Sequence, residues 1–152
     1  MIIRKAEDGD ILQIKELFRQ TVLSVNIKDY TLEQAECWAS RGDDESIWKQ
    51  RIAEQYFIVA GQYNVITGFA ALKPDGYLNS LFVHKDYQGR GVASLLLQDI
   101  EAYVQRNGIG EMTADVSITA KPFFERKGYE VLKEQKVNIG VEMVNYKMGK
   151  KL

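Results

Sequence analysis

The chain has 152 residues, of which 45% are hydrophobic and 27% charged, and 20 Lys and Arg against 21 Asp and Glu give a net charge of -1. This length favours a single domain over residues 1–152, large enough to bury a core. The balanced charge argues against a nucleic-acid partner, and no apolar stretch is long enough to cross a membrane. Cys37 is the single cysteine, and the first residues lack an apolar signal segment, so we expect a cytoplasmic protein without disulfides.

The first half of the chain shows helical and strand patterns in alternation. The expected elements are a strand at 1–6, a helix begun by Asp8 or Asp10, a helix begun by the capping box Thr31-Leu32-Glu33-Gln34, a short helix at 46–54, and strands at 56–60 and 65–73 joined by a hairpin turn at 62–64.

The second half begins with a turn, Pro74-Asp75-Gly76, in which proline presets φ and glycine tolerates positive φ. The expected elements after it are a strand at 77–83, a polar loop at 84–91, a helix at 92–106 closed by Asn107-Gly108, a strand at 111–116, a short helix at 121–127, and two strands that flank Gly140. The mixed order predicts an α+β or α/β domain with one twisted sheet.

The loop before the helix at 92–106 is the most informative segment. A helix N-terminus carries N–H groups without internal partners and a partial positive charge, so it attracts anions. Gly89 and Gly91 would let a phosphate approach the backbone, and Arg90 adds a cation. Two interpretations remain open from these residues alone: a phosphate or pyrophosphate site at Gly89 to Ser94, or a tight strand-to-helix turn.

Two common nucleotide motifs do not fit this loop. In a Rossmann loop the glycines follow their strand at once, whereas five residues separate Val83 from Gly89. The loop also lacks the Gly-Lys-Ser/Thr of a Walker-type site. A dinucleotide-binding oxidoreductase is therefore a distant alternative.

Two segments resemble those of a known family. Gln88-Gly89-Arg90-Gly91-Val92-Ala93 is similar to the Q/R-x-x-G-x-G/A motif of the GNAT superfamily of N-acetyltransferases, and Ala120 to Tyr129 is similar to the family's A-x-x-F-Y-E-K-x-G-F segment. The resemblance extends along essentially the whole chain, and the C-terminal residues resemble a bacterial branch of uncharacterised acetyltransferases.

The resemblance implies a fold and an activity. The GNAT fold is α/β (α+β), with a mixed twisted sheet of about seven strands flanked by about four helices and splayed between the Leu78–Val83 and Glu111–Val116 strands. The implied activity moves an acetyl group from acetyl-CoA to a primary amine of a small molecule, peptide or protein, by direct transfer in a ternary complex and without a metal. The alternative is a non-catalytic acyl-CoA-binding or regulatory module; many relatives are homodimers.

The resemblance also assigns cofactor contacts. The backbone of Leu81, Phe82 and Val83 would hold the pantetheine arm. The pyrophosphate would lie against Gln88, Gly89, Arg90, Gly91, Val92, Ala93 and Ser94. Ser117 stands where many relatives have a cofactor-binding Asn, and Phe124 stands where the family often has a Tyr acid. Because Phe124 has no hydroxyl, the acid is left open between Ser117, Tyr129 and a bound water.

Candidates for the remaining roles follow from residue type and position. Asp115 could accept the proton of the amine or could form a structural hydrogen bond at the strand end, and Glu111 is a poorer candidate base. Asn79 and Ser80 point to opposite sides of their strand, so one of them would face the substrate.

Tyr30, Trp38 and Trp48 lie in the region that shapes the acceptor pocket in the family, although both Trp residues also suit a core. His84, the single histidine, lies in the loop, where a solvated or loop-bonding role is favoured over catalysis. One His and one Cys cannot supply an ordinary metal-ligand set.

Overall fold

Seven strands form one mixed sheet in the computed structural model, which describes residues 1–152. The spatial order is β1-β2-β3-β4-β5-β7-β6, and every neighbouring pair is antiparallel except β4 and β5. The strands are β1 (Ile2–Lys5), β2 (Tyr56–Gln62), β3 (Val65–Leu72), β4 (Tyr77–Val83), β5 (Glu111–Ser117), β6 (Glu130–Asn138) and β7 (Glu142–Lys151). The expected seven-stranded mixed sheet is confirmed.

Five α-helices accompany the sheet, where the resemblance implies about four, and each lies in a segment for which the sequence pattern predicts a helix. They are α1 (Ile11–Ser24), α2 (Leu32–Ser40), α3 (Glu45–Glu54), α4 (Val92–Arg106) and α5 (Lys121–Arg126), with short 3-10 turns at Asp8–Asp10, Asn26–Asp29 and Lys85–Tyr87. The segment between β1 and β2 contains three of the helices because Asp44 begins a new one: its Oδ1 accepts hydrogen bonds from the Ser46 N–H and hydroxyl.

The two expected N-terminal caps differ in outcome. Thr31 and Gln34 form the predicted capping box at the start of α2. Asp10 precedes α1, but its carboxylate does not cap that helix. It accepts instead from the Glu7 N–H and from the Arg4 guanidinium, at 2.8 Å each, and closes the 3-10 turn.

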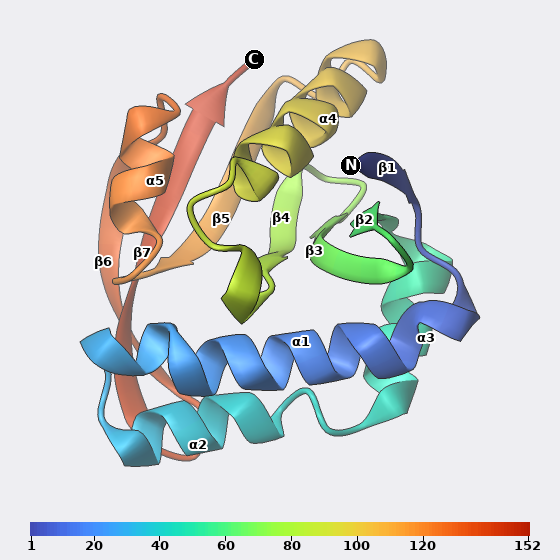
Figure 1. Ribbon diagram of the computed structural model, residues 1–152. Coiled ribbons are helices and arrows are strands. Elements are labelled where there is room, and N and C mark those ends of the chain that lie inside the picture. The colour runs from blue at the N-terminus through green and yellow to red at the C-terminus, as the bar shows by residue number, and fades with distance from the viewer.

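Each face of the sheet has its own apolar core. The apolar stripe of α4, which includes Leu96, Ile100 and Val104, packs on one face against strands β2 to β5. The opposite face over β2 and β3 is covered by α1 and its neighbours, where Phe18 and Trp48 are buried. Figure 1 shows α1 and α2 running side by side along the edge of the molecule away from α4. No helix combines the length and apolar character needed to span a membrane.

The parallel pair β4–β5 is joined only at its beginning. Tyr77 pairs with Thr113 and Leu78 with Ala114, and beyond them the strands diverge. The predicted turn fixes this joint: the Thr113 N–H donates to the Gly76 oxygen at 3.1 Å. Gly76 has a φ of +94°, and a Cβ there would collide with the backbone oxygen of Glu111. The expected splay between these two strands is therefore confirmed.

An irregular residue changes the facing of β4 just after the joint. Leu78 pairs with Leu72 and Ser80 with Ala71, so Asn79 has no opposite partner in β3. Such a bulge breaks the simple alternation of side chains. Leu81 consequently packs on the α4 side, whereas Phe82 packs on the α1 side.

The β6–β7 hairpin closes the molecule against α2. The Gln34 side-chain amide donates to the Glu142 oxygen at 2.8 Å, and a Cβ at Gly140 would lie 3.8 Å from the Cys37 sulfur. The Tyr30 hydroxyl, just after α1, also donates to the Val144 oxygen of β7. The divergent strands are thus enclosed by helices on one side and by the hairpin on the other.

Candidate active site

A cleft of about 1100 Å³ opens where β4 and β5 diverge. Its wall comes from α1 to α3, β4, the glycine loop, β5, the start of α5 and the β6–β7 hairpin. The structure brings together nearly all of the predicted site residues, with Arg90 as the exception. The predicted residues in the wall are Tyr30, Asn79, Ser80, Leu81, Phe82, Val83, Gln88, Gly89, Gly91, Val92, Ala93, Ser94, Asp115, Ser117 and Phe124.

Strand β4 turns backbone groups that do not pair with β3 into this cleft. The His84 N–H bonds to the Thr67 oxygen of β3, which sets the alternation of the antiparallel ladder. By that alternation the backbone groups of Phe82 point to β3, whereas those of Leu81 and Val83 point away from it, toward the diverging β5. Of the three residues whose backbone was expected to hold the cofactor, Leu81 and Val83 therefore have backbone groups that face the cleft, whereas those of Phe82 pair with β3.

The glycine loop ends at a helix N-terminus with free donors. Gly91 is the N-cap of α4, and the Leu95 N–H makes the first helical bond to its oxygen at 3.0 Å. The N–H groups of Val92, Ala93 and Ser94 consequently have no helical partner. Gly89 and Gly91 have φ of +72° and +79°, and a Cβ on either would meet open space. The glycines thus make the expected tight turn, and that turn presents N–H donors; the phosphate site stays a prediction.

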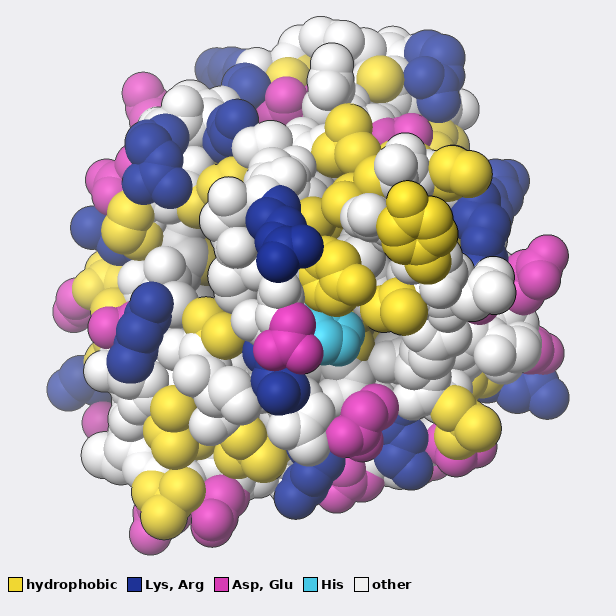
Figure 2. Space-filling view, viewed as in Figure 1, with side chains coloured by type: hydrophobic (Ala, Val, Ile, Leu, Met, Phe, Trp, Pro, Cys, Tyr) yellow, Lys and Arg dark blue, Asp and Glu magenta, His cyan; other side chains and the backbone are white.

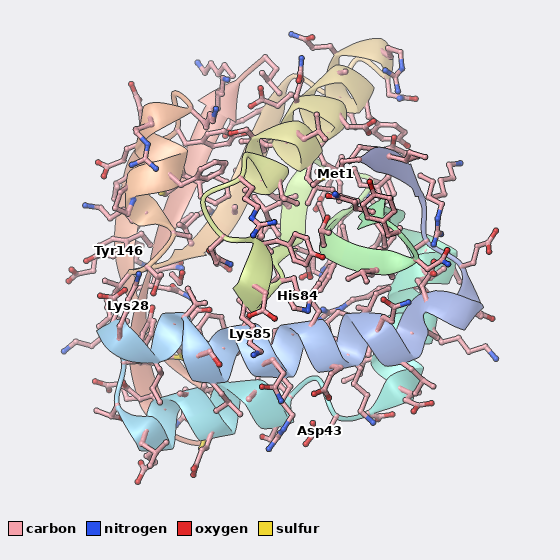
Figure 3. All side chains as sticks on the ribbon, in the orientation of Figure 1. Met1, Lys28, Asp43, His84, Lys85 and Tyr146 are labelled. Carbon is pink, nitrogen blue, oxygen red and sulfur yellow. The ribbon has the colours of Figure 1, made fainter.

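Side chains around the loop fix its shape. The Gln88 amide and the Thr21 hydroxyl both donate to the Val83 oxygen, at 2.8 Å and 2.9 Å. The Arg90 guanidinium is exposed and lies 5.1 Å from the centre of the Tyr87 ring. Nδ1 of His84 accepts a hydrogen bond from the Asp86 N–H at 3.0 Å. His84 lies on the surface beside α1 (Figures 2 and 3). His84 thus has the expected loop-bonding contact.

The end of β5 supplies hydroxyl groups to the opposite wall. Ser117 Oγ accepts from the Ala120 N–H at 3.1 Å, which leaves its own proton free to donate. Thr119 Oγ1 is buried in the wall without any hydrogen-bond partner. Phe124 is buried against Tyr129, whose hydroxyl donates to Glu101 and lies outside the cleft wall. Tyr129 therefore does not supply the hydroxyl that Phe124 lacks.

Asp115 lies at the base of the splay within a polar cluster. Its Oδ2 accepts from the Tyr77 hydroxyl at 2.8 Å, and its Oδ1 accepts from the Gln135 amide at 3.0 Å. Gln135 also donates to Asn145 at 2.9 Å. Burial and the neighbouring carboxylate of Asp115 raise the pKa of Tyr77, which keeps its hydroxyl protonated. The structural hydrogen bonds expected for Asp115 are thus present, and the carboxylate also faces the cleft.

Aromatic residues close the end of the cleft near α2. The Tyr30 hydroxyl donates to the Val144 oxygen at 2.8 Å and accepts from the Ile118 N–H at 2.9 Å, so it ties the hairpin to the end of β5. Burial raises the pKa of Tyr30. Its ring makes an edge contact with half-buried Trp38. Trp48 is a buried core residue whose indole N–H donates to Gly42.

Three residues in the wall escape sequence reasoning: Arg51, Tyr77 and Thr119. Arg51 lies on α3, with its guanidinium carbon 5.2 Å from the Trp48 ring centre. Tyr77 begins β4. The alternation of side chains along the strand was the signal that could have predicted that Tyr77 faces Asp115. Thr119 follows the motif position of Ser117 by two residues, and nothing in the pattern marks its hydroxyl as unpartnered.

The geometry is that of an open cleft that runs along β4 and reaches the N-terminus of α4. A family model described as Acetyltransferase (GNAT) domain matches residues 26–150. The chain belongs to this family and is an acyltransferase of the N-acetyltransferase type.

Individual relatives agree with this assignment. The chain is 36% identical over 147 residues to a protein of Escherichia coli K12 named Uncharacterized N-acetyltransferase YafP, covering 96% of this chain and 93% of that one. A GCN5-related N-acetyltransferase from Rhodopseudomonas palustris is 32% identical with a TM-score of 0.96, over 99% and 95% of the two chains. The PaiA N-acetyltransferase from Thermoplasma acidophilum, solved with coenzyme A, shares the fold at 20% identity, with a TM-score of 0.84 over 99% and 98% of the chains.

Proposed function

We propose that the chain binds acetyl-CoA in the cleft between β4 and β5 and transfers the acetyl group to a primary amine in a ternary complex. The observation that carries this proposal is the backbone of Leu81 and Val83, which faces the cleft without a strand partner and leads to the N–H groups at the start of α4 that lack helical partners. The pantetheine arm would extend β4 as an added strand, and the pyrophosphate would accept from Val92, Ala93 and Ser94.

The chain's own groups fit such a ligand. Backbone N–H groups supply the local positive field that a net charge of -1 does not. The hydroxyl of Thr119 is buried without a partner, and buried polar groups are nearly always satisfied, so a ligand amide or a water bound with it would complete its bonding. Arg90, held on Tyr87 at the rim, would meet a phosphate only by leaving that ring.

Each protein group has a separate task in the transfer. Acetyl-CoA, when bound, would supply a thioester whose acetyl group moves to the nitrogen of the neutral amine, while the carbon–sulfur bond breaks and the departing thiolate takes up a proton from water. Asp115 accepts the proton that the amine nitrogen gives up, directly or through water. Ser117, whose proton is free, donates a hydrogen bond at the departing sulfur. Proximity in the ternary complex supplies much of the acceleration, about 7–11 kcal/mol in well-oriented reactions.

The cofactor assignment is tested by melting curves and thiol release. Acetyl-CoA at a hundred times its Kd should stabilise the folded protein by about 2.7 kcal/mol and raise its melting temperature. Thiol release with any amine would exclude a module that only binds acyl-CoA. An unchanged melting temperature together with a flat calorimetric titration would contradict the proposal.

The role of Asp115 is tested by its isosteric amide. Asp115→Asn should lower kcat by about a hundredfold or more, because a general base contributes roughly that much, while acetyl-CoA binding is retained. Gln135→Ala serves as the matched variant, since it removes one hydrogen bond to Asp115 and keeps the carboxylate. A kcat that survives in Asp115→Asn would leave Asp115 with its structural role alone.

We also propose one domain over residues 1–152, because a single sheet includes elements from both ends of the chain. The single cysteine, Cys37, which forms no disulfide, supports a proposed cytoplasmic location. A homodimer is compatible with edge strand β6, on which Val131 and Leu132 are 41% and 55% exposed.

A further inference from the structure

One guanidinium group lines the cleft without a carboxylate partner. Arg51 is half-buried, and it makes no ion pair within 4.0 Å. Its one hydrogen bond is a long one, 3.4 Å to Ser80 Oγ. The other cations of the cleft wall, Lys28, Arg41 and Arg126, are exposed to solvent.

The desolvation of the Arg51 guanidinium is unfavourable, and no carboxylate of the protein offsets it. Desolvation lowers the pKa of Arg51, which means that its surroundings disfavour the charge. A cation–π contact with the Trp48 ring, whose centre lies 5.2 Å from the guanidinium carbon, offsets part of this desolvation. A half-buried guanidinium with unused N–H donors is a strong site for a small anion, because it can make two parallel charge-assisted hydrogen bonds.

A negative charge of the cleft lies beside Tyr77. The wall contains two acidic residues, Asp44 and Asp115. Asp44 is used to cap α3, whereas Asp115 faces the cleft and accepts from the Tyr77 hydroxyl. The positive charge of Arg51 acts on that same tyrosine. Arg51 and Asp115 therefore place opposite charges in one cleft, where Arg51 contacts Ser80 and Asp115 contacts Tyr77 of the same strand.

We propose that the acceptor is an amino-acid-like zwitterion whose carboxylate binds Arg51 while its amine lies beside Asp115. This inference rests on the proposed acetyl transfer and adds the chemical class of the acceptor. Arg51 would then determine specificity by binding, because it contacts a part of the acceptor that does not react. A neutral amine would leave the guanidinium unpaired, and a polyamine would bring a second cation to it.

The test compares acids with their own amides. Wild type, Arg51→Ala and Arg51→Lys are assayed by thiol release with the free α-amino acids and with the carboxamide of each. We expect Arg51→Ala to raise KM for the acids by about tenfold or more, the value of a charge-assisted hydrogen bond, with little change for the carboxamides. Because each acceptor is compared between variants, the different amine pKa of acid and amide cancels.

Two further variants separate binding from folding. Arg51→Lys keeps the positive charge but lacks the planar guanidinium, so its KM for the acids should lie between those of wild type and Arg51→Ala. Lys49→Ala, on an exposed turn of the same helix and outside the cleft wall, should leave both acceptor classes unchanged.

The outcomes distinguish this inference from the proposed function. If Arg51→Ala affects acids and carboxamides equally, or if wild type acetylates neutral amines and not amino acids, the inference is overturned and acetyl transfer stands. Binding of acetyl-CoA without turnover of either class overturns it as well. If acetyl-CoA does not bind at all, the failure lies in the proposed function.

Discussion

Asp10 is the residue whose charge should most clearly affect the free energy of unfolding, because it forms an ion pair with Arg4. The Arg4 guanidinium and the Glu7 N–H hold the pKa of the Asp10 carboxyl below its usual value. A carboxyl whose pKa is lowered in the folded state stabilises the protein above its unfolded pKa of about 4. That stabilisation is lost as the pH falls through the folded pKa.

Asp10→Asn should therefore destabilise the protein at pH 7 by about 1–3 kcal/mol, and the difference from wild type should shrink below about pH 4. Urea unfolding at several pH values measures both effects. Asp43→Asn is the control, because its pair with Arg19 is exposed on both sides and should contribute less than about 1 kcal/mol. Equal losses for the two variants would mean that the Asp10 pair is no better than a surface contact.

For single residues, the sequence predicts membership of the site where the residue belongs to a motif or has a side chain suited to the chemistry. Asp115 could be predicted as a site residue because carboxylates are rare in strands and because it lies two residues before Ser117. Arg51 could not, because one arginine in a polar helix has many possible directions and only the packed structure turns it onto Trp48. The use of the Tyr30 hydroxyl was equally hidden, since its partners Val144 and Ile118 are far away in the chain.

Helix α4 offers a matched comparison at the scale of an element, because it has a left-handed glycine at each end. Gly91 has a φ of +79° and Gly108 of +67°, and a Cβ on either would meet open space. Replacing either glycine with valine should cost about 1–3 kcal/mol of backbone strain. The two variants should therefore show similar losses in melting temperature.

Only Gly91→Val should also lose the stabilisation by acetyl-CoA, because only that glycine presents the N–H groups proposed to bind phosphate. Calorimetric titration of the two variants, both checked for folding by circular dichroism, makes the comparison. Full binding by Gly91→Val would place the phosphates elsewhere.

Most elements could be predicted from periodicity and capping, and their exact facing could not. The limits of β4 followed from its turn and loop, yet the bulge at Asn79 arises from pairing with β3, which has no local signature. Helix α3 was predicted as a short helix at 46–54, but the cap by Asp44 that begins it at Glu45 was not.

The whole molecule consists of two sheet halves joined at one place. Strands β1 to β4 form one half and β5 to β7 the other, and the parallel joint has only two residue pairs. Tyr77 and Asp115 add a side-chain hydrogen bond across it, and Tyr30 ties the hairpin to the end of β5. Family motifs made the splay predictable, whereas the way in which α2 and the hairpin enclose it depends on contacts between distant segments.

The divergence of β4 also gives the strand two populations of amides. Those of Ser80 and Phe82 are bonded to β3 and should exchange slowly with deuterium, whereas those of Leu81 and Val83 face the cleft and should exchange faster. Along one short strand the protection should therefore alternate residue by residue. Addition of acetyl-CoA should slow Leu81 and Val83 alone and erase that alternation, as residue-resolved exchange by NMR can record. In its free state, then, β4 is an interior strand by position and an edge strand by its amide exchange.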